Sequence, residues 1–140
     1  MSKKIHFQIV TPEKVVYKDD VDSIALPTQI GEITVLPNHA PLISSLKSGE
    51  AIIKKDGEEF SIAVSGGFLQ IQPKNKVVVL ADMAERAEEI SEERADEARK
   101  RAEEILKEKR LDKAEMATAA AALEKSLIRL KVVRRRTGRR

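Results

Sequence analysis

The sequence predicts an all-β domain followed by helices: an N-terminal antiparallel β-sandwich or barrel, then a C-terminal antiparallel two-helix hairpin. Three observations support this class. Short runs rich in β-branched residues recur through the first 80 residues. Turn-forming residues separate these runs without any helix-length segment, which argues against parallel strand–helix–strand packing. Residues 82–132 then contain no glycine or proline and consist largely of good helix formers.

The strands can be placed one by one from their turns. Asp56 and Gly57, between two strand-like runs, are typical of a hairpin turn because both positions tolerate positive φ. Short strands with turn signals every 8–12 residues or so are typical of antiparallel sandwiches and barrels. The predicted strands cover residues 6–10, 14–17, 23–26, 32–36, 51–54, 60–64, 68–71 and 76–80.

The helical segment divides into two helices. Ser91 is the predicted N-cap of the first, before two glutamates whose charge suits a helix N-terminus. Asp112 with Glu115 three residues later resembles a capping box and starts the second. The predicted domains are therefore residues 1–82 and 83–140. The predicted apolar faces comprise Ala95, Ala98, Ala102, Ile105 and Leu106 on the first helix, and Ala119, Leu123, Leu127 and Leu130 on the second.

The seam of this hairpin is poor in large side chains. Three alanines of the first helix would face the alanine-rich run 117–122 of the second. Each alanine buries little apolar area, at about 25 cal/mol per Å². Because helices gain most of their stability from packing, such a hairpin should open more readily than a core helix. We therefore predict a conformationally mobile arm.

Composition excludes several kinds of site. The 140-residue chain has no cysteine, which rules out disulfides, thiol nucleophiles and cysteine-based zinc sites and fits a reducing compartment. The two histidines lie far apart in sequence, and no phosphate-binding loop, dinucleotide fingerprint or nucleophile elbow is present. We expect no catalytic residues, no metal site and no required cofactor. No apolar run is long enough to span a membrane, so any membrane link is expected to run through a partner.

Charge is distributed in blocks. Residues 1–80 carry nine basic and nine acidic side chains, whereas residues 82–104 carry ten acidic against five basic. Residues 125–140 carry eight basic side chains and no acidic one. Such an end suits an acidic protein surface, or nucleic acid or an anionic membrane bound by a stand-alone module. The scarcity of aromatic residues and of recognition motifs argues against nucleic acid. The residues alone do not choose between these partners.

Several motifs resemble the epsilon subunit of bacterial F-type ATP synthases. Residues 31–42, GEITVLPNHAPL, resemble that family's G-E-[LIM]-x-[VI]-[LY]-P-[GN]-H-A-P-L signature. Residues 64–71, VSGGFLQI, resemble its strand pair, and residues 7–13 and 77–82 also fit. The resemblance covers nearly the whole chain in order, up to Val133. It implies a non-catalytic rotor subunit of the central stalk of a proton-translocating enzyme.

The resemblance also implies partners and a location. The family's sandwich packs on the gamma subunit and touches the c-ring, so Glu32 and His39 are expected at or near those contacts. Its helices fold down or extend toward the catalytic head, where the extended form blocks rotation in the hydrolysis direction. The chain is then expected at the cytoplasmic face of the bacterial cell membrane, held there only through the complex, with no nucleic-acid partner. A rigid turn at residues 37–41 would serve either fold or docking.

Some bacterial members of the family bind ATP on the hairpin through an [IL]-D-x-x-R-A motif. Arg94 matches it here, but Ser91 stands where the family has aspartate, which removes a charged acceptor. The alternative is that Ser91 is only a helix cap and Arg94 only a surface ion-pair partner. The match at Arg94 makes ATP, with or without Mg²⁺, an expected regulatory ligand. Its expected site comprises Glu85, Ile90, Ser91, Arg94, Ala95, Arg101, Lys125 and Arg129.

The basic end acquires a partner through the same resemblance. In the family, the extended helix meets an acidic loop of the catalytic beta subunits. Basic side chains would be attracted to that loop, and the attraction would weaken with salt. The expected contacts are Lys125, Arg129, Lys131, Arg134, Arg135 and Arg136.

Overall fold

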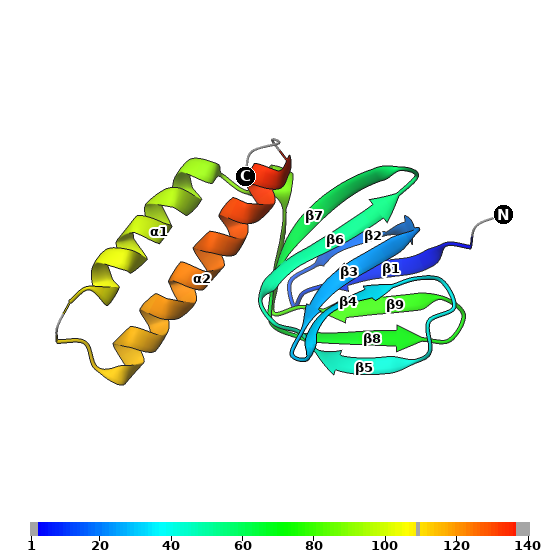
Figure 1. The fold of residues 1–140 in the computed structure, drawn as a ribbon, viewed down its shortest axis with the longest axis horizontal. Helices are drawn as coiled ribbons and strands as arrows, with labels where there is room; N and C mark the ends of the chain where they lie inside the picture. Colours follow the sequence, from blue (N-terminus) through cyan, green and yellow to red (C-terminus); the bar gives the residue numbers. More distant parts are fainter. Residues whose placement is uncertain (1–2, 109, 137–140) are drawn as a thin grey trace. The chain divides into compact units, whose positions relative to one another are not determined.

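In the computed structural model, which describes residues 3–108 and 110–136, ten strands precede two α-helices (Figure 1). The chain divides into two units, residues 1–86 and 87–140. The strands are β1 (Ile5–Val10), β2 (Val15–Val21), β3 (Ser23–Thr28), β4 (Gly31–Val35), β5 (Leu42–Ser45), β6 (Gly49–Lys55), β7 (Glu58–Ser65), β8 (Phe68–Gln72), β9 (Lys76–Leu80) and β10 (Met83–Arg86). The predicted β-plus-α class is confirmed.

The ten strands form two five-stranded sheets. Sheet A has the order β2-β1-β9-β8-β5, and sheet B has the order β10-β7-β6-β3-β4. Every pairing between these strands is antiparallel except that of β1 with β9, which is parallel. The hairpin predicted at residues 56–57 joins β6 to β7, with φ of 50° at Asp56 and 81° at Gly57.

Two strands, β5 and β10, are not predicted by the sequence. β5 is a four-residue edge strand with two serines, and its composition does not stand out from a loop. β10 has a helix-favouring composition, yet it pairs with β7 from Met83 opposite Ser65 to Arg86 opposite Ile62. Tertiary pairing overrides local propensity here. As a result the first unit ends at Arg86, four residues later than the predicted boundary at 82.

The core of the first unit is aliphatic with one aromatic cluster. Inward residues alternate along the strands, and Ile9, Ile24 and Ile53 are completely buried. The Tyr17 ring lies between Phe7 and Phe60, with centroid separations of 6.0 and 5.4 Å. Burial raises the pKa of Tyr17 to about 12, so the phenol stays neutral in the core.

Arg86, the last residue of β10, is anchored from two sides. Its guanidinium carbon lies 5.5 Å from the centre of the Tyr17 ring, and its Nε donates a 2.9 Å hydrogen bond to the Val16 carbonyl. Cation–π and hydrogen-bond contacts of this kind stabilise an arginine stem against the sheet. The first unit therefore ends on a fixed residue.

A charged cluster joins the start of β1 to β2 and to the β6–β7 turn. Lys4 Nζ donates to Asp22 at 2.6 Å and to Asp56 at 2.8 Å, and the Asp56 amide donates to Asp22 at 2.7 Å. The hydrogen bond from Lys4 holds the pKa of Asp22 below its ordinary value, and the same contact raises the pKa of Lys4 to about 12. Lys55 makes an analogous pair with Asp19. The cluster therefore favours the charged forms on both sides.

We predict that Asp22→Asn makes the unfolding free energy less dependent on acid. A carboxyl whose pKa is lowered on folding stabilises the protein above its unfolded pKa, near 3.8, and loses that contribution as pH falls through the folded pKa. Urea unfolding at pH 7, 4 and 2.5 should show the wild type ahead at pH 7 and the gap closing in acid. Glu13→Gln, outside the cluster, is the control. A gap that stays constant with pH would contradict the assignment.

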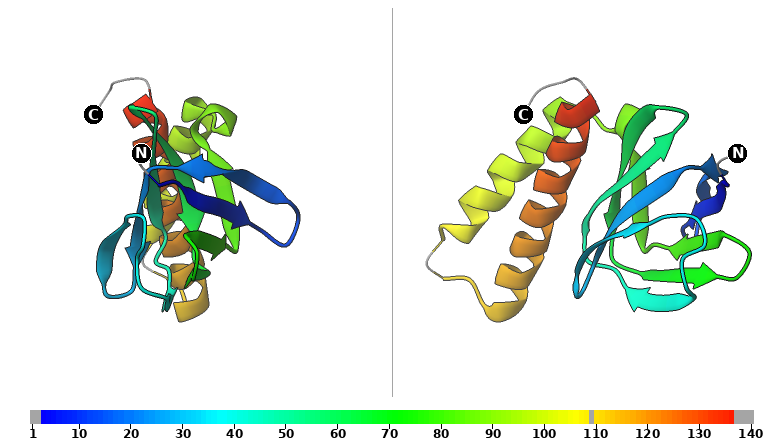
Figure 2. Two further views of the ribbon diagram at one scale, coloured as in Figure 1. Left: turned by 90° about the vertical axis from the view of Figure 1, so that its right-hand side faces the viewer. Right: turned by 45° about the vertical axis from the view of Figure 1, so that its right-hand side comes forward.

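The second unit begins with the short 3₁₀ helix η1 (Ala87–Glu89), followed by α1 (Glu92–Leu106) and α2 (Lys113–Arg136). The two helices run antiparallel side by side (Figure 2). Both predicted caps are confirmed: Ser91 Oγ accepts from the Arg94 amide at 3.3 Å, and Asp112 Oδ1 accepts from the Glu115 amide at 2.7 Å.

The apolar faces of the two helices differ from the prediction at several positions, and Ile105 on α1 is 40% exposed. Leu127 is 48% exposed, and the neighbouring Ser126 is buried in its place. Ser126 tolerates burial because its hydroxyl donates a 2.8 Å hydrogen bond to the Ala122 carbonyl. Three of the five buried positions that the structure describes on α2, Ala119, Ser126 and Val133, follow a seven-residue repeat, and only Ala119 of these was predicted. A serine within the buried set is consistent with a thinly packed helix.

Candidate docking face and helical hairpin

The two residues predicted to dock mark separate points of the first unit. Glu32 is exposed near the start of β4, opposite Pro27 of β3. His39 is exposed in the loop after β4, and its Nδ1 donates to the Ala40 carbonyl at 2.6 Å. That loop is shaped by Asn38, which has a φ of 67° and whose amide donates to Asn75 Oδ1 at 2.5 Å. The loop is thus an ordered, exposed element.

The outward face of sheet A carries a row of apolar side chains that the sequence analysis did not single out. Register places Val15, Val10, Leu80 and Phe68 side by side across β2, β1, β9 and β8. Val15, Leu80 and Phe68 are 54%, 50% and 56% exposed. We call these four residues the apolar row. Ile43, 71% exposed, adds to the same face on β5.

A continuous apolar row at the surface is unusual in a protein that works alone. Single exposed apolar residues are ordinary, whereas contiguous ones mark interaction sites. Strand alternation in the sequence could have shown that Phe68 and Leu80 point away from the core, since Leu69 and Val79 point into it. It could not have shown that they are neighbours, because that requires the strand order.

Seven of the eight residues predicted to bind ATP lie in the second unit, and Glu85 lies in β10 of the first. Ile90 and Ala95 are buried and serve as packing residues. Ser91 caps α1. The predicted polar contacts Arg94 and Arg101 are exposed on α1, seven residues apart and therefore on one face, while Lys125 and Arg129 are half-buried on α2.

A groove of about 530 Å³ runs between the two helices near the loop that joins them. Small side chains form much of it, notably Ala98, Ala102, Ala119 and Ala122, and Arg101 lies at its side. Alanines on both helices leave the seam unfilled at this end, as the composition predicted. The thinly packed seam is the structural basis for expecting an arm that opens.

Ion pairs form within α1 and between α1 and α2. Arg99 contacts Asp96 at 2.8 Å and Glu103 at 3.0 Å, one turn before and after it. Arg134 Nε lies 3.3 Å from Glu92 and thereby joins the end of α2 to the start of α1.

The other residues predicted to contact beta subunits also lie on α2. Lys131 and Arg135 are exposed and one turn apart, so they share a face. The side chain of Arg136 and residues 137–140 lie outside the described residues.

Within residues 3–108 and 110–136, no cluster of three or more histidine or acidic side chains is arranged to hold a metal ion. Over the same residues, neither helix is long and apolar enough to cross a membrane.

Comparison with known proteins accounts for both units. The model of the ATP synthase, Delta/Epsilon chain, beta-sandwich domain matches residues 4–87, and that of the long alpha-helix domain matches residues 88–134. A protein named ATP synthase epsilon chain from Dehalococcoides mccartyi is 46% identical over 133 residues, 95% of this chain and 94% of that protein. One of the same name from Chloroflexus aggregans is 47% identical over 128 residues, 91% of each chain.

Two solved structures share the fold. A chain of the Euglena gracilis mitochondrial ATP synthase superposes with a TM-score of 0.77 at 23% identity, over 89% of this chain and 78% of that one. A chain of the Tetrahymena thermophila mitochondrial ATP synthase central stalk and c-ring gives 0.58 at 15% identity, over 95% and 99%. At these identities the likeness concerns the fold alone.

Proposed function

Because the chain belongs to the ATP synthase delta/epsilon chain family, we propose that it is a central-stalk subunit of a proton-translocating F-type ATP synthase. As a family member it is a non-catalytic subunit. In this role it couples rotation to ATP synthesis and restrains ATP hydrolysis through its helical hairpin. It reaches the cytoplasmic face of the membrane only through the complex.

The apolar row is the observation that carries this proposal. A stalk subunit must hold its partner through every rotation, which needs a permanent apolar contact in addition to polar ones. The row offers side chains from four adjacent strands on one rigid sheet, so little ordering entropy is lost on binding. The gamma subunit is the proposed partner for this face. Glu32 and the loop that carries His39 are the proposed sites of further contacts with the gamma subunit and the c-ring.

Co-purification tests the stalk assignment. The chain and the gamma subunit encoded with it should elute together from a sizing column at high salt, because apolar contacts survive screening. Retention on nucleic acid or anionic vesicles that salt removes, without a gamma complex, would instead support a stand-alone basic module.

The hairpin supports the regulatory half of the proposal. Its seam consists of small side chains, and its last turns carry exposed Lys131 and Arg135. Weak internal packing lowers the free energy of opening, and basic side chains favour an acidic partner surface. The proposed partner is the acidic loop of the beta subunits. On opening, the hairpin loses the weak packing between its two helices and gains contacts with the catalytic head.

We also propose ATP as a weak regulatory ligand of the hairpin. Arg94 and Arg101 on one face of α1 provide cationic donors suited to phosphate. The Ser91 hydroxyl is already engaged by the Arg94 amide, so it offers a poorer acceptor to the donor groups of a nucleotide than an aspartate would. Affinity should therefore be limited at this position.

Ser91→Asp should raise the affinity for ATP about tenfold, because aspartate caps a helix as well as serine does and adds a second carboxylate oxygen. Calorimetric titration of the full chain with ATP and Mg²⁺ measures it. Arg94→Ala should abolish the heat in both backgrounds, while Ser91→Ala should cost about 1 kcal/mol of hairpin stability. No binding by either the wild type or Ser91→Asp would remove ATP from the account.

A further inference from the structure

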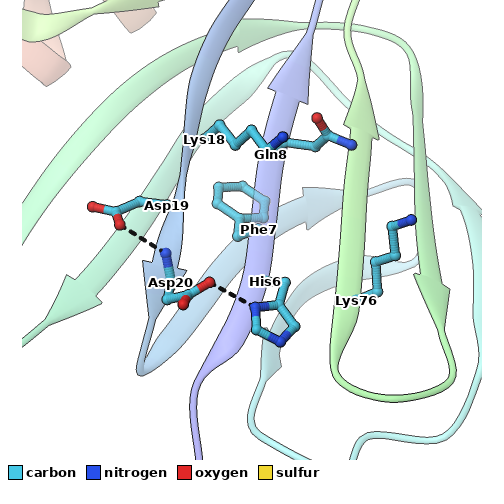
Figure 3. Close-up of a pocket in the computed structure, with 7 residues that line it drawn as sticks. All are labelled: His6, Phe7, Gln8, Lys18, Asp19, Asp20 and Lys76. Atoms are coloured by element: carbon cyan, nitrogen blue, oxygen red, sulfur yellow. Dashed lines mark hydrogen bonds and ion pairs between the residues drawn. The ribbon is translucent and has the colours of Figure 1, made fainter.

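The outward face of sheet A continues beyond the apolar row into polar rows. In register order, the next row holds Lys18, Gln8, Val78, Gln70 and Ile43, and the one after holds Asp20, His6, Lys76 and Gln72. A hollow lies over the β2, β1 and β9 end of these rows (Figure 3). Its lining residues are His6, Phe7, Gln8, Lys18, Asp19, Asp20 and Lys76.

The charges around this hollow are unequal. Lys18 and Lys76 flank it from β2 and β9, and both are exposed without an ion pair among the described residues. Asp20 is the single outward-facing acid on the described strands of sheet A, and His6 Nδ1 contacts it at 2.6 Å. Asp19 belongs to the opposite side of β2, where it pairs with Lys55. The hollow therefore presents two ammonium groups and the Gln8 amide against one outward-facing carboxylate, that of Asp20.

The hollow is also connected to the loop that carries His39. Asn75, in the turn between β8 and β9, accepts a hydrogen bond from the His6 amide through its carbonyl at 2.7 Å. Its side-chain oxygen accepts from the Asn38 amide at 2.5 Å. One residue thus fixes the floor of the hollow and the neighbouring loop together. The apolar row, the hollow and the loop form one continuous, ordered surface.

We propose that this hollow receives a carboxylate-bearing segment of the same subunit that covers the apolar row. The inference rests on the proposed stalk function and adds the chemistry of the partner: an apolar strip bordered by acidic side chains on the Lys18–Lys76 side. Apolar contact supplies most of the affinity, while the two lysines set orientation and association rate. Interfaces commonly combine an apolar centre with a charged rim in this way.

The test measures binding of the full chain to the gamma subunit at about 50 mM and about 500 mM salt. Lys18→Glu with Lys76→Glu should weaken binding about tenfold at low salt and less than threefold at high salt, because screening removes the charge term. The matched control is Lys47→Glu with Lys113→Glu, which makes the same charge change at exposed positions outside sheet A. Unfolding in urea checks that each variant folds.

The outcomes separate the inference from the function beneath it. The carboxylate partner is supported if only the Lys18/Lys76 double variant binds the gamma subunit more weakly, with the salt dependence described. The inference is overturned if the Lys18/Lys76 double variant and the control double variant bind the gamma subunit equally well. If a substitution in the apolar row still breaks the complex in that case, the stalk function stands. Absence of binding by the wild-type chain overturns both.

Discussion

Phe68→Asp should weaken binding of the chain to the gamma subunit by about 100-fold without unfolding it. Phe68 is 56% exposed at the end of the apolar row, so the folded monomer loses little when the ring is removed. In the complex, however, the aspartate would be buried against an apolar strip. Losing a buried aromatic contact and desolvating a charge together cost about 3 kcal/mol.

Titration calorimetry with the gamma subunit measures this change. Met116→Asp, at a 49% exposed apolar residue on α2, is the matched control and should bind like the wild type. The urea midpoints of both variants should stay within about 0.5 kcal/mol of the parent, as is usual for surface substitutions. Unchanged binding by Phe68→Asp would mean that the outward face of sheet A is not the docking face.

Gly67→Ala adds a single methyl group and should lower the free energy of unfolding by about 4 kcal/mol. Gly67 has a φ of +106°, and a Cβ there would lie 2.0 Å from the Leu80 carbonyl oxygen and 2.8 Å from the Ala81 Cα. Both atoms are backbone of the β9 end, so the clash cannot be relieved by rotating a side chain. The hairpin of β8 and β9 would have to separate.

Gly31→Ala isolates the contribution of this close approach. Gly31 has a φ of +120°, and a Cβ there meets nothing within 4 Å. It therefore suffers only the conformational penalty of the positive φ, about 1 to 2 kcal/mol. Chemical denaturation followed by circular dichroism compares the two variants. If Gly67→Ala costs no more than Gly31→Ala, the close approach of the two strands is wrong.

Local signals in the sequence predicted local structure well. Ser91 and Asp112 were identified as caps because their side chains bond to amides three residues away, which sequence spacing determines. The turn at Asp56 and Gly57 was identified for the same reason. Interactions of this range depend on neighbouring residues only.

Features that depend on distant pairing were missed. β1 pairs in parallel with β9, so Val10 becomes a neighbour of Leu80, seventy residues later in the chain. No periodicity within either strand reveals that contact, and the apolar row cannot be predicted without it. β10 failed similarly, since its pairing with β7 decides its conformation against its propensity. Leu127 was misplaced because a serine with a hydroxyl bonded to its own helix was not counted as buried.

The ATP-binding residues of the hairpin are predicted from the family resemblance, and the structure shows which of them are buried and which are exposed. Ile90 and Ala95 are buried, so their side chains pack within the hairpin. Arg94 and Arg101 remain available in position, and Ser91 has a structural role that any nucleotide contact would have to share. The sequence alone could not distinguish packing members of the motif from contacting ones.

The rate of ATP hydrolysis by the reconstituted catalytic complex tests the central claim most directly. Saturating wild-type chain should lower the rate, and Lys131→Glu with Arg135→Glu should relieve most of that inhibition while binding gamma normally. These two exposed residues lie on one face of α2, and circular dichroism of the variant checks that the helical hairpin persists. The relief should be mimicked by raising salt. A hydrolysis rate that the bound wild-type chain leaves unchanged would contradict a regulatory arm.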